Sequence, residues 1–133
     1  MSLKRFGVSL EDNLLNDLDE IVERKQFPNR SQAIRFLISQ SKVEEKWEDD
    51  VEVAGAIVIV YDHHKKDLQT KSTDIQHDYH ENILSVQHVH LDHNNCLETI
   101  AVKGKSSKLR NLSDRLIALK GIKHGKLVLS ACG

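Results

Sequence analysis

The sequence lacks the features that mark membrane, secreted and repeat proteins. It has no apolar run near the roughly 20 residues that a bilayer span needs, and its first residues enter an alternating pattern instead of a signal-peptide core. It contains no internal repeat and no low-complexity segment. We therefore expect a cytoplasmic protein with no membrane contact, built as one medium domain or two small ones.

Cysteine is scarce, with only Cys96 and Cys132. A single disulfide is compatible with this count, but free or metal-bound thiols are favoured in the cytosol.

Positive charge is not in excess either. The formal net charge is −1, and residues 1–47 hold eight basic and eight acidic side chains. Binding to DNA would therefore depend on a local arrangement of basic groups and not on the charge of the whole chain.

Histidine, in contrast, is abundant and clustered. Seven of the eight histidines lie between His63 and His93. A solvated surface does not need so many imidazoles, whereas a metal site does.

The first 47 residues predict a strand followed by two helices. Apolar and polar side chains alternate over residues 4–10: Phe6, Val8 and Leu10 against Arg5, Gly7 and Ser9. This alternation is typical of a half-buried strand. Helical spacing of apolar residues follows over 11–25, and after Pro28 a second helix, capped by Asn29, is expected to reach Trp47.

A strand of seven residues cannot satisfy its backbone groups alone. Two copies of the chain could pair these strands antiparallel, with four helices closing a common core. The paired strands would present Arg5, Gly7 and Ser9 twice on one face, and a two-stranded ribbon of this kind fits the major groove of DNA.

The acidic segment 48–52 predicts a linker to a second domain over residues 53–133. The pattern of this domain is strand, helix, strand, strand, helix, strand, which is ferredoxin-like. The expected elements cover 53–61, 64–76, 83–91, 96–103, a helix that begins at Ser106 or Ser107, and 122–131. The dense apolar run of the first strand is typical of a buried strand. The predicted fold class is α+β.

The sharpest motif is His88-Val89-His90, followed after a turn by Cys96. Two histidines at this spacing project from one face of a strand, and a hairpin centred on His93 would place Cys96 opposite His90. His77, at the end of the predicted helix, could supply a fourth donor, most readily across an oligomer interface. Three nitrogens and one sulfur suit zinc as well as square-planar Ni(II) or Cu(II), so spacing alone leaves the metal open.

Two family resemblances bear on these segments. Residues 5–10 and 29–35, the latter including Arg35, resemble the ribbon-helix-helix repressors, and Gln76-His77 with residues 86–98 resembles the nickel-responsive repressor family (NikR). The second resemblance covers essentially the whole chain. It implies a head over 1–47 that binds double-stranded DNA, and an ACT-type domain over 53–133 that forms the core of a homotetramer, a dimer of dimers.

The resemblance also implies roles for individual residues. His88, His90 and Cys96 of one subunit and His77 of another would bind one Ni(II) per subunit, with Gln76 and Glu98 orienting the ligands. Tyr61 and His63 fall at family positions near the metal or auxiliary metal sites. Arg5, Gly7 and Ser9 would face the bases, while Lys65 and Lys66 match a basic pair near the DNA backbone. The implied protein is a repressor of nickel uptake that binds a palindromic operator when nickel is bound, and not an enzyme.

The sequence departs from these families at three positions. Gly7 replaces a hydrogen-bonding side chain of the ribbon-helix-helix strand. Gln32 and Phe36 stand where the nickel family can place carboxylates for a potassium ion, and Phe36 cannot ligate a cation. The other histidines, His64, His80, His93 and His124, are interpreted as exposed residues or weak sites filled in metal excess.

Two alternatives remain at this point. A metal-independent regulator with the same head would leave the histidine cluster without a role. A zinc or iron metalloprotein could use His88, His90 and Glu98 as a two-histidine, one-carboxylate iron site, although the nearby thiolate of Cys96 argues against it.

Overall fold

The computed structural model of the chain describes residues 2–132 and divides it into two compact units, with the boundary after Ser41. Each unit is described by itself. None of the helices among the described residues combines the length and apolar character needed to cross a membrane. The domain boundary predicted at 48–52 stays a prediction.

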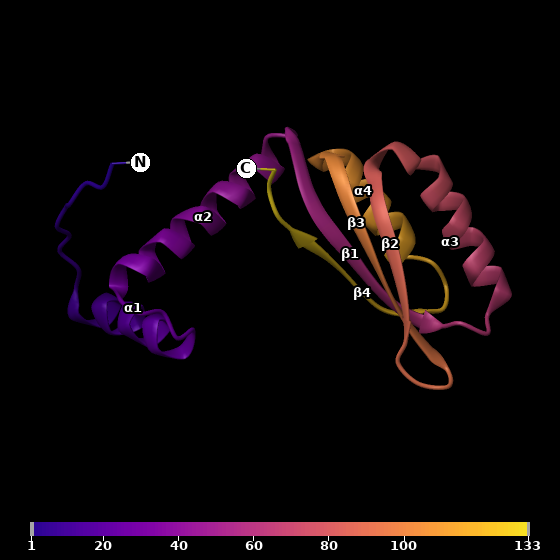
Figure 1. Cartoon of the computed structure of the whole chain (residues 1–133), viewed down its shortest axis with the longest axis horizontal. Helices are drawn as coiled ribbons and strands as arrows, with labels where there is room; N and C mark the ends of the chain where they lie inside the picture. The colour runs from indigo at the N-terminus through magenta and orange to yellow at the C-terminus, as the bar shows by residue number, and fades with distance from the viewer. Residues whose placement is uncertain (1, 133) are drawn as a thin grey trace. The chain divides into compact units, whose positions relative to one another are not determined.

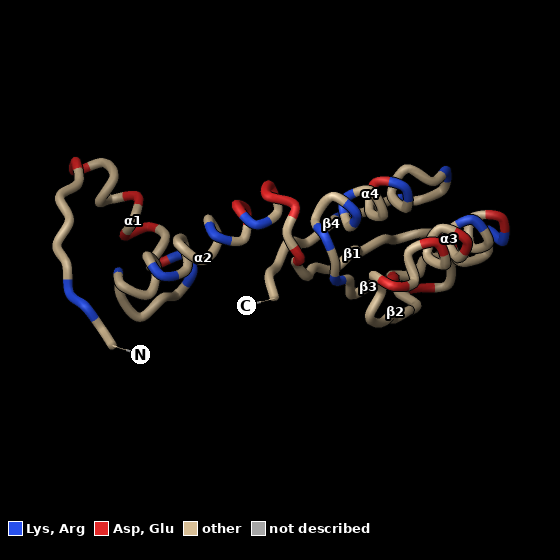
Figure 2. The backbone as a smooth tube through the Cα atoms, turned by 90° about the horizontal axis from the view of Figure 1, so that it is seen from above, with Lys and Arg blue, Asp and Glu red and all other residues tan. Residues whose placement is uncertain are grey.

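The first unit contains α1 (Asp12–Arg24) and the first part of α2 (Arg30–Glu48), as the apolar spacing predicts. Helix α2 is capped by Asn29, whose side-chain oxygen accepts a hydrogen bond from the backbone N–H of Gln32 at 2.9 Å. Arg30 forms a two-pronged ion pair with Asp19 of α1 at 2.8 and 3.0 Å. Figure 2 shows acidic residues along α1 and a mixture of basic and acidic residues along α2.

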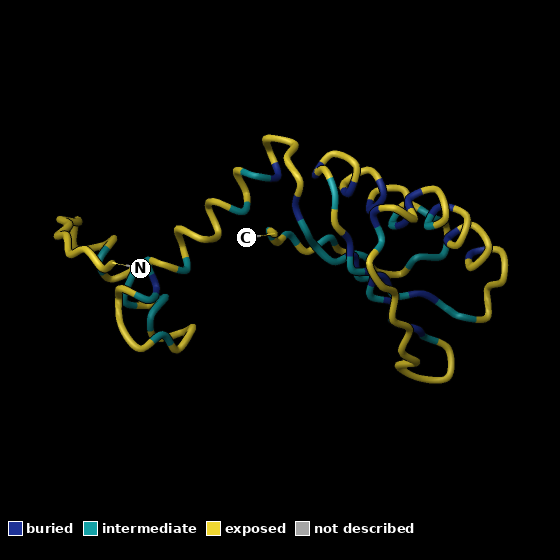
Figure 3. Tube along the Cα trace, turned by 45° about the horizontal axis from the view of Figure 1, so that its top comes forward, coloured by how far each residue is buried: buried dark blue, intermediate teal, exposed yellow. Residues whose placement is uncertain are grey.

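The strand predicted over residues 4–10 is not formed in the single chain. Residues 2–11 carry no helix or strand, and residues 2–10 are exposed throughout (Figure 3). The physical reason is that strand geometry requires a hydrogen-bonded neighbour, and this chain offers none to the segment. The ribbon-helix-helix head is therefore not confirmed by the structure of one chain.

The second unit holds the predicted ferredoxin-like order (Figure 1). Its elements are β1 (Glu52–Asp62), α3 (Lys66–Asp78), the short 3₁₀ helix η1 (His80–Asn82), β2 (Ile83–His90), β3 (Asn95–Lys105), α4 (Ser106–Ile117) and β4 (Ile122–Leu129). The four strands form one sheet in the order β2-β3-β1-β4, with every neighbouring pair antiparallel.

Helices α3 and α4 cover one face of this sheet (Figure 1). The core between them and the sheet includes Ile57 and Ile59 of β1, Ile100 of β3 and Leu109 and Leu112 of α4, all without exposed surface. This alternation puts every second side chain of β1 and β3 under the helices.

The opposite face of the sheet is apolar but uncovered in the single chain. Val58 and Val60 of β1 are half-buried, and Val128 of β4 and Val89 of β2 are 47% and 43% exposed. The predicted burial of the first strand is thus met on one face only, because both helices pack on the same side of the sheet.

The end of α2 belongs to the second unit and packs within it through Trp47, which is 2% exposed. Its indole N–H donates to the carbonyl of Ser130 at 2.8 Å, and its own carbonyl accepts from the hydroxyl of Ser106 at 2.6 Å. A Cβ at Gly55 would approach the Trp47 ring to 3.2 Å and the Val128 carbonyl to 2.6 Å, so glycine leaves room for the ring on β1. Trp47 is therefore a packing residue.

Replacement of Ile100 by alanine should destabilise the second unit by about 2–5 kcal/mol, since it opens a cavity between the sheet and both helices. Urea unfolding at fixed protein concentration, followed by circular dichroism, measures the loss. Lys108→Ala on the exposed side of α4 is the control, with an expected change within about 0.5 kcal/mol. Equal losses in the two variants would contradict this placement of the core.

Candidate metal site

The pairing of β2 with β3 gathers the predicted donors on the helix-covered face of the sheet. His90 lies directly opposite Cys96, and His88 lies directly opposite Glu98. Residues directly opposite each other in an antiparallel pair share a face, so all four side chains leave the sheet on the same side. The hairpin predicted from the sequence produces this register.

Glu98 is the buried acid of the site, with 2% of its side chain exposed. One carboxylate oxygen accepts a hydrogen bond from the hydroxyl of Tyr61 at 2.7 Å, and the other accepts from the side-chain amide of Gln76 on α3, also at 2.7 Å. The first oxygen also lies 3.4 Å from His88 Nδ1. Among the described residues, no buried side-chain oxygen or nitrogen is left without a partner.

His88 and Cys96 approach each other at this carboxylate. The Cys96 sulfur lies 3.9 Å from His88 Nδ1, and the Tyr61 hydroxyl lies 3.3 Å from the same nitrogen. Burial, and then the hydrogen bond to the Glu98 carboxylate, raise the pKa of Tyr61, so that its hydroxyl remains a proton donor. Cys96 is buried and, like Cys132, free, so the two cysteines form no disulfide in this structure.

Tyr61, His88, Glu98 and Gln76 line a polar pocket of about 240 Å³ between α3 and the sheet. Its wall also includes Gln69, Ser72 and Thr73 of α3. Ser72 accepts a hydrogen bond from the Gln76 amide at 3.1 Å and so helps to orient it toward Glu98. Gln76 and Glu98 are joined by a hydrogen bond, and the supporting roles that the resemblance implies for them stay predictions.

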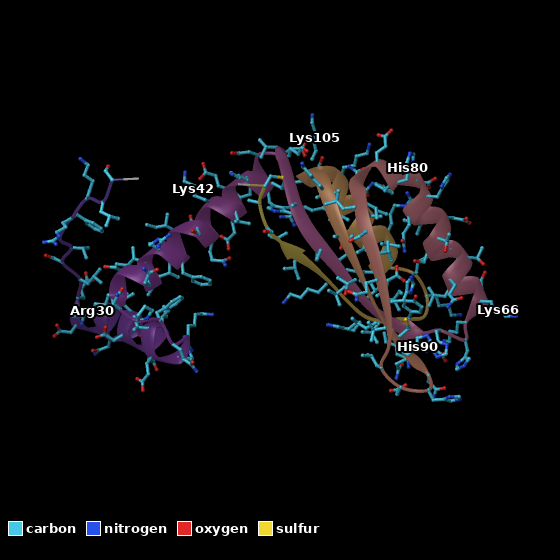
Figure 4. All side chains as sticks on the ribbon, viewed as in Figure 1. Arg30, Lys42, Lys66, His80, His90 and Lys105 are labelled. Carbon is cyan, nitrogen blue, oxygen red and sulfur yellow. The ribbon has the colours of Figure 1, made fainter. Side chains whose placement is uncertain are left out.

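The His90 ring lies beside the segment that follows β1; Figure 4 labels its place near the hairpin between β2 and β3. Its ring stacks on His63 with centroids 4.5 Å apart, and His63 contacts His64, which in turn contacts His93. His63 Nε2 donates to the carbonyl of His93 at 2.8 Å. The strand register therefore brings His88, His90 and Cys96 to one face of the sheet, as expected. Their side chains do not converge on one point, because the His90 ring packs on His63.

The hairpin between β2 and β3 is held by Asp92. Its carboxylate accepts hydrogen bonds from the backbone N–H groups of Asn94 and Asn95 and from the Asn95 side-chain amide, at 2.8–3.0 Å. These donors, the Asn95 amide first, lower the pKa of Asp92, so the turn keeps an ionised carboxylate. This turn fixes the register that places His90 opposite Cys96.

His77 lies on the exposed side of α3, one residue before its end. Its ring stands 5.8 Å from that of His80, whose Nδ1 donates to the His77 carbonyl at 3.1 Å. Figure 4 places His80 and Lys66 at opposite ends of α3. Within residues 2–132 of one chain, no three His, Cys, Asp or Glu side chains lie close enough together to hold a metal ion.

The donor set fits a borderline metal such as nickel, but one chain presents it incompletely. A thiolate and an imidazole meet at Cys96 and His88, a second imidazole is available at His90, and the adjoining Glu98 can fix the orientation of a ligating ring. A further donor from outside this group is needed to complete a four-coordinate site.

The residues predicted to bind DNA are all exposed. Arg5, Gly7 and Ser9 lie in the segment without regular structure, and Arg35 of α2 donates to the side chain of Gln32 at 3.4 Å. Lys65 and Lys66 stand at the beginning of α3 and line a surface groove with Lys71 and Lys120. Their roles toward DNA stay predictions.

Gln32 and Phe36, which stand where the nickel family can place carboxylates for a potassium ion, make other contacts. The Phe36 ring packs against Phe27 with centroids 5.4 Å apart, and Lys25 stands over it at 5.2 Å. Gln32 is engaged by the Asn29 cap and by Arg35. These contacts account for an apolar ring at position 36.

Sequence reasoning missed two features of this region. The chain of ring contacts from His90 to His93 depends on the antiparallel pairing of β1 with β3, which brings His63 beside the hairpin; its N–H donates to the Asn94 carbonyl at 3.3 Å. The hydrogen bonds of Tyr79 to α4 were missed as well. The signal for the first was the position of His63 directly after the apolar strand β1.

The chain matches known proteins over nearly its whole length. Residues 54–130 match the model of the NikR C terminal nickel binding domain. A protein of Syntrophus aciditrophicus is 51% identical over 97% of this chain and 94% of its own length, and one of Desulfovibrio desulfuricans is 51% identical over 99% and 96%. Both are provisionally named nickel-responsive regulators, and neither name is that of an enzyme.

Solved structures agree with the fold of the second unit. The ACT domain of a GTP pyrophosphokinase from Chlorobium tepidum aligns with a TM-score of 0.50 at 18% identity, over 59% of this chain and all of that one. A protein of Thermotoga maritima without an assigned function aligns with a TM-score of 0.54 at 18% identity, over 59% of this chain and 98% of its own. With its ACT-like sheet and its match to the nickel-binding domain, the chain belongs to the NikR family of nickel-responsive regulators.

Proposed function

We propose that this protein is a repressor that binds a palindromic operator when Ni(II) occupies its second unit, and that it controls nickel uptake. The observation that carries the metal half is the meeting of three side chains: the Cys96 sulfur lies 3.9 Å, and an oxygen of the buried Glu98 lies 3.4 Å, from His88 Nδ1. The family membership supports nickel as the metal.

The apolar surface of the first unit supports a ribbon-helix-helix head made by two chains. Phe6 and Val8 are 76% and 61% exposed, and Leu14 of α1 and Ile38 of α2 are 45% and 57% exposed. So small a unit cannot leave this much apolar surface in water and stay stable, so a second copy is the natural cover. Pairing residues 4–10 of two chains would also satisfy their backbone groups and turn Arg5, Gly7 and Ser9 toward the major groove.

The uncovered face of the sheet supports further assembly into a homotetramer, a dimer of dimers. Its apolar side chains, Val58, Val60, Val89 and Val128 among them, are suited to pack against the same face of another chain. Within such an assembly, His77 of one subunit would complete the donors of another, with one nickel per subunit.

In this proposal His88, His90 and Cys96 hold the metal from one chain, and His77 holds it from the partner chain. Glu98 fixes the ring of His88 and is itself held by Tyr61 and Gln76. Nickel bound by ligands from two chains would link the subunits and so favour one arrangement of the assembly. Metal and operator then favour the same arrangement, so each must raise the affinity for the other by the same factor.

Titration of the metal-free protein with Ni(II) should produce a thiolate-to-nickel charge-transfer band that saturates at one metal per chain, because Cys96 supplies the sulfur. Cys96→Ala should lack the band, and Cys132→Ala, which removes the exposed cysteine, should keep it. Electronic absorption measures both. Colourless binding of zinc with no nickel band would leave a zinc protein or a metal-independent regulator as the better description.

Mixing two inactive variants tests whether the site is shared between chains. His77→Ala and Cys96→Ala should each lack the complete site, yet oligomers reassembled from both contain some chains whose Cys96 faces an intact His77. The charge-transfer band should therefore return in part in the mixture. If His77 served the site of its own chain, the mixed protein would show no band beyond the sum of the two variants.

Arg5→Ala should weaken operator binding about tenfold and leave nickel affinity unchanged, because Arg5 is proposed to contact bases and lies in a unit without metal donors. The operator is first obtained by selecting random duplexes against the nickel-loaded protein, and affinity is then measured by fluorescence anisotropy. Lys4→Ala, which alters the neighbouring charge, should have a smaller effect. Normal operator affinity in Arg5→Ala would exclude this strand face as the reading surface.

A further inference from the structure

We propose that Tyr79 is a positioning residue: it ties the C-terminal end of α3 to α4 and so holds His77 in place for the metal. This inference rests on the proposed function, in which His77 is a ligand to the partner's metal. Tyr79, Asn111 and Arg115 together are called the Tyr79 clamp.

Tyr79 directly follows α3 and is buried, with 7% of its surface exposed, although both of its neighbours are exposed. Its backbone closes the helix, since its N–H donates to the Gln76 carbonyl at 3.1 Å and its carbonyl accepts from the N–H of Asn82 at 2.8 Å. The residue therefore stands where the helix gives way to the turn that leads into β2.

The phenol oxygen is held from α4. It accepts hydrogen bonds from Asn111 Nδ2 at 2.7 Å and from Arg115 Nη1 at 3.4 Å, and these two residues share a face of α4 because they are four positions apart. The Arg115 guanidinium also lies 5.5 Å from the centre of the Tyr79 ring and 3.6 Å from the carboxylate of Asp78.

A second contact fixes the turn itself. The Asn82 side-chain amide donates to the carbonyl of Lys103 on β3 at 3.2 Å, and a Cβ at Gly104 would collide with that amide. The backbone between His77 and β2 is thus held on one side by α4 and on the other by the sheet.

The His77 side chain is exposed, and among residues 2–132 its ring contact is with the equally exposed His80. Its position is set by the helix end that carries it. The same end carries Gln76, which reaches Glu98. A fixed helix end lowers the entropic cost of bringing a ligand to a site on another chain, so the clamp should raise metal affinity without touching the metal.

Tyr79→Phe tests this directly, because it removes the phenol oxygen and keeps the ring. In the metal-free full-length protein, amides at residues 75–79 should exchange with solvent about tenfold faster, as measured by hydrogen exchange. Nickel affinity should fall about fivefold, and the double variant with His77→Ala should bind nickel as His77→Ala alone does. Asn111→Ala should reproduce both effects and carries the test if Tyr79→Phe does not fold.

Leu127→Ala is the matched control, since it removes a core contact from β4 at the opposite edge of the sheet from β2. It should lower stability without changing exchange at 75–79 relative to the rest of the unit. Unchanged exchange in Tyr79→Phe, or an equal loss of affinity when His77 is already alanine, would overturn the proposal. If the unmodified protein gives no nickel band, the proposed function fails, while the exchange measurement still decides the clamp.

Discussion

Burying the Glu98 carboxylate is the constraint around which the metal-binding unit is organised. A carboxylate with 2% exposure is costly unless its oxygens are paired, and here each oxygen accepts a short hydrogen bond. Those bonds come from Tyr61 on β1 and Gln76 on α3, so one buried charge ties two strands and a helix together. The same carboxylate lies against His88, so the fold controls the orientation of a ring that is proposed to hold the metal.

Only part of this site could be predicted from the sequence, because some of its contacts are local and others join distant segments. Residues 88–96 predict the hairpin because turn composition and strand alternation are local properties, and the register of His90 with Cys96 follows from them. The supporting roles of Gln76 and Glu98 came from family resemblance and stay a proposal, to which the structure adds the hydrogen bond between the two side chains. The turn of the His90 ring toward His63 could not be predicted, since it depends on the path of the chain after β1.

The fold shows the same division between local and distant causes. The predicted ends of α1 and α2 lie within one residue of the observed ends. These ends could be predicted because the apolar stripe and the Asn29 cap are contained in the segment itself. The strand over residues 4–10 shows alternation just as clear, yet it is not formed, because its pairing partner is not part of one chain. Tyr79 contacts residues that lie 32 and 36 positions further along the chain, and no periodic pattern in the sequence predicts such contacts.

The anchoring of Trp47 has a practical consequence for spectroscopy. The chain contains one tryptophan, Trp47, so its indole emission reports on a single environment. There the ring lies beside Gly55 of β1 and donates a hydrogen bond to the carbonyl of Ser130. The ring is shielded from water, and the Arg110 guanidinium stands 5.3 Å from its centre. A shift of the indole emission toward longer wavelength would therefore report, without an added label, that the end of α2 had lost its contacts with β1 and Ser130.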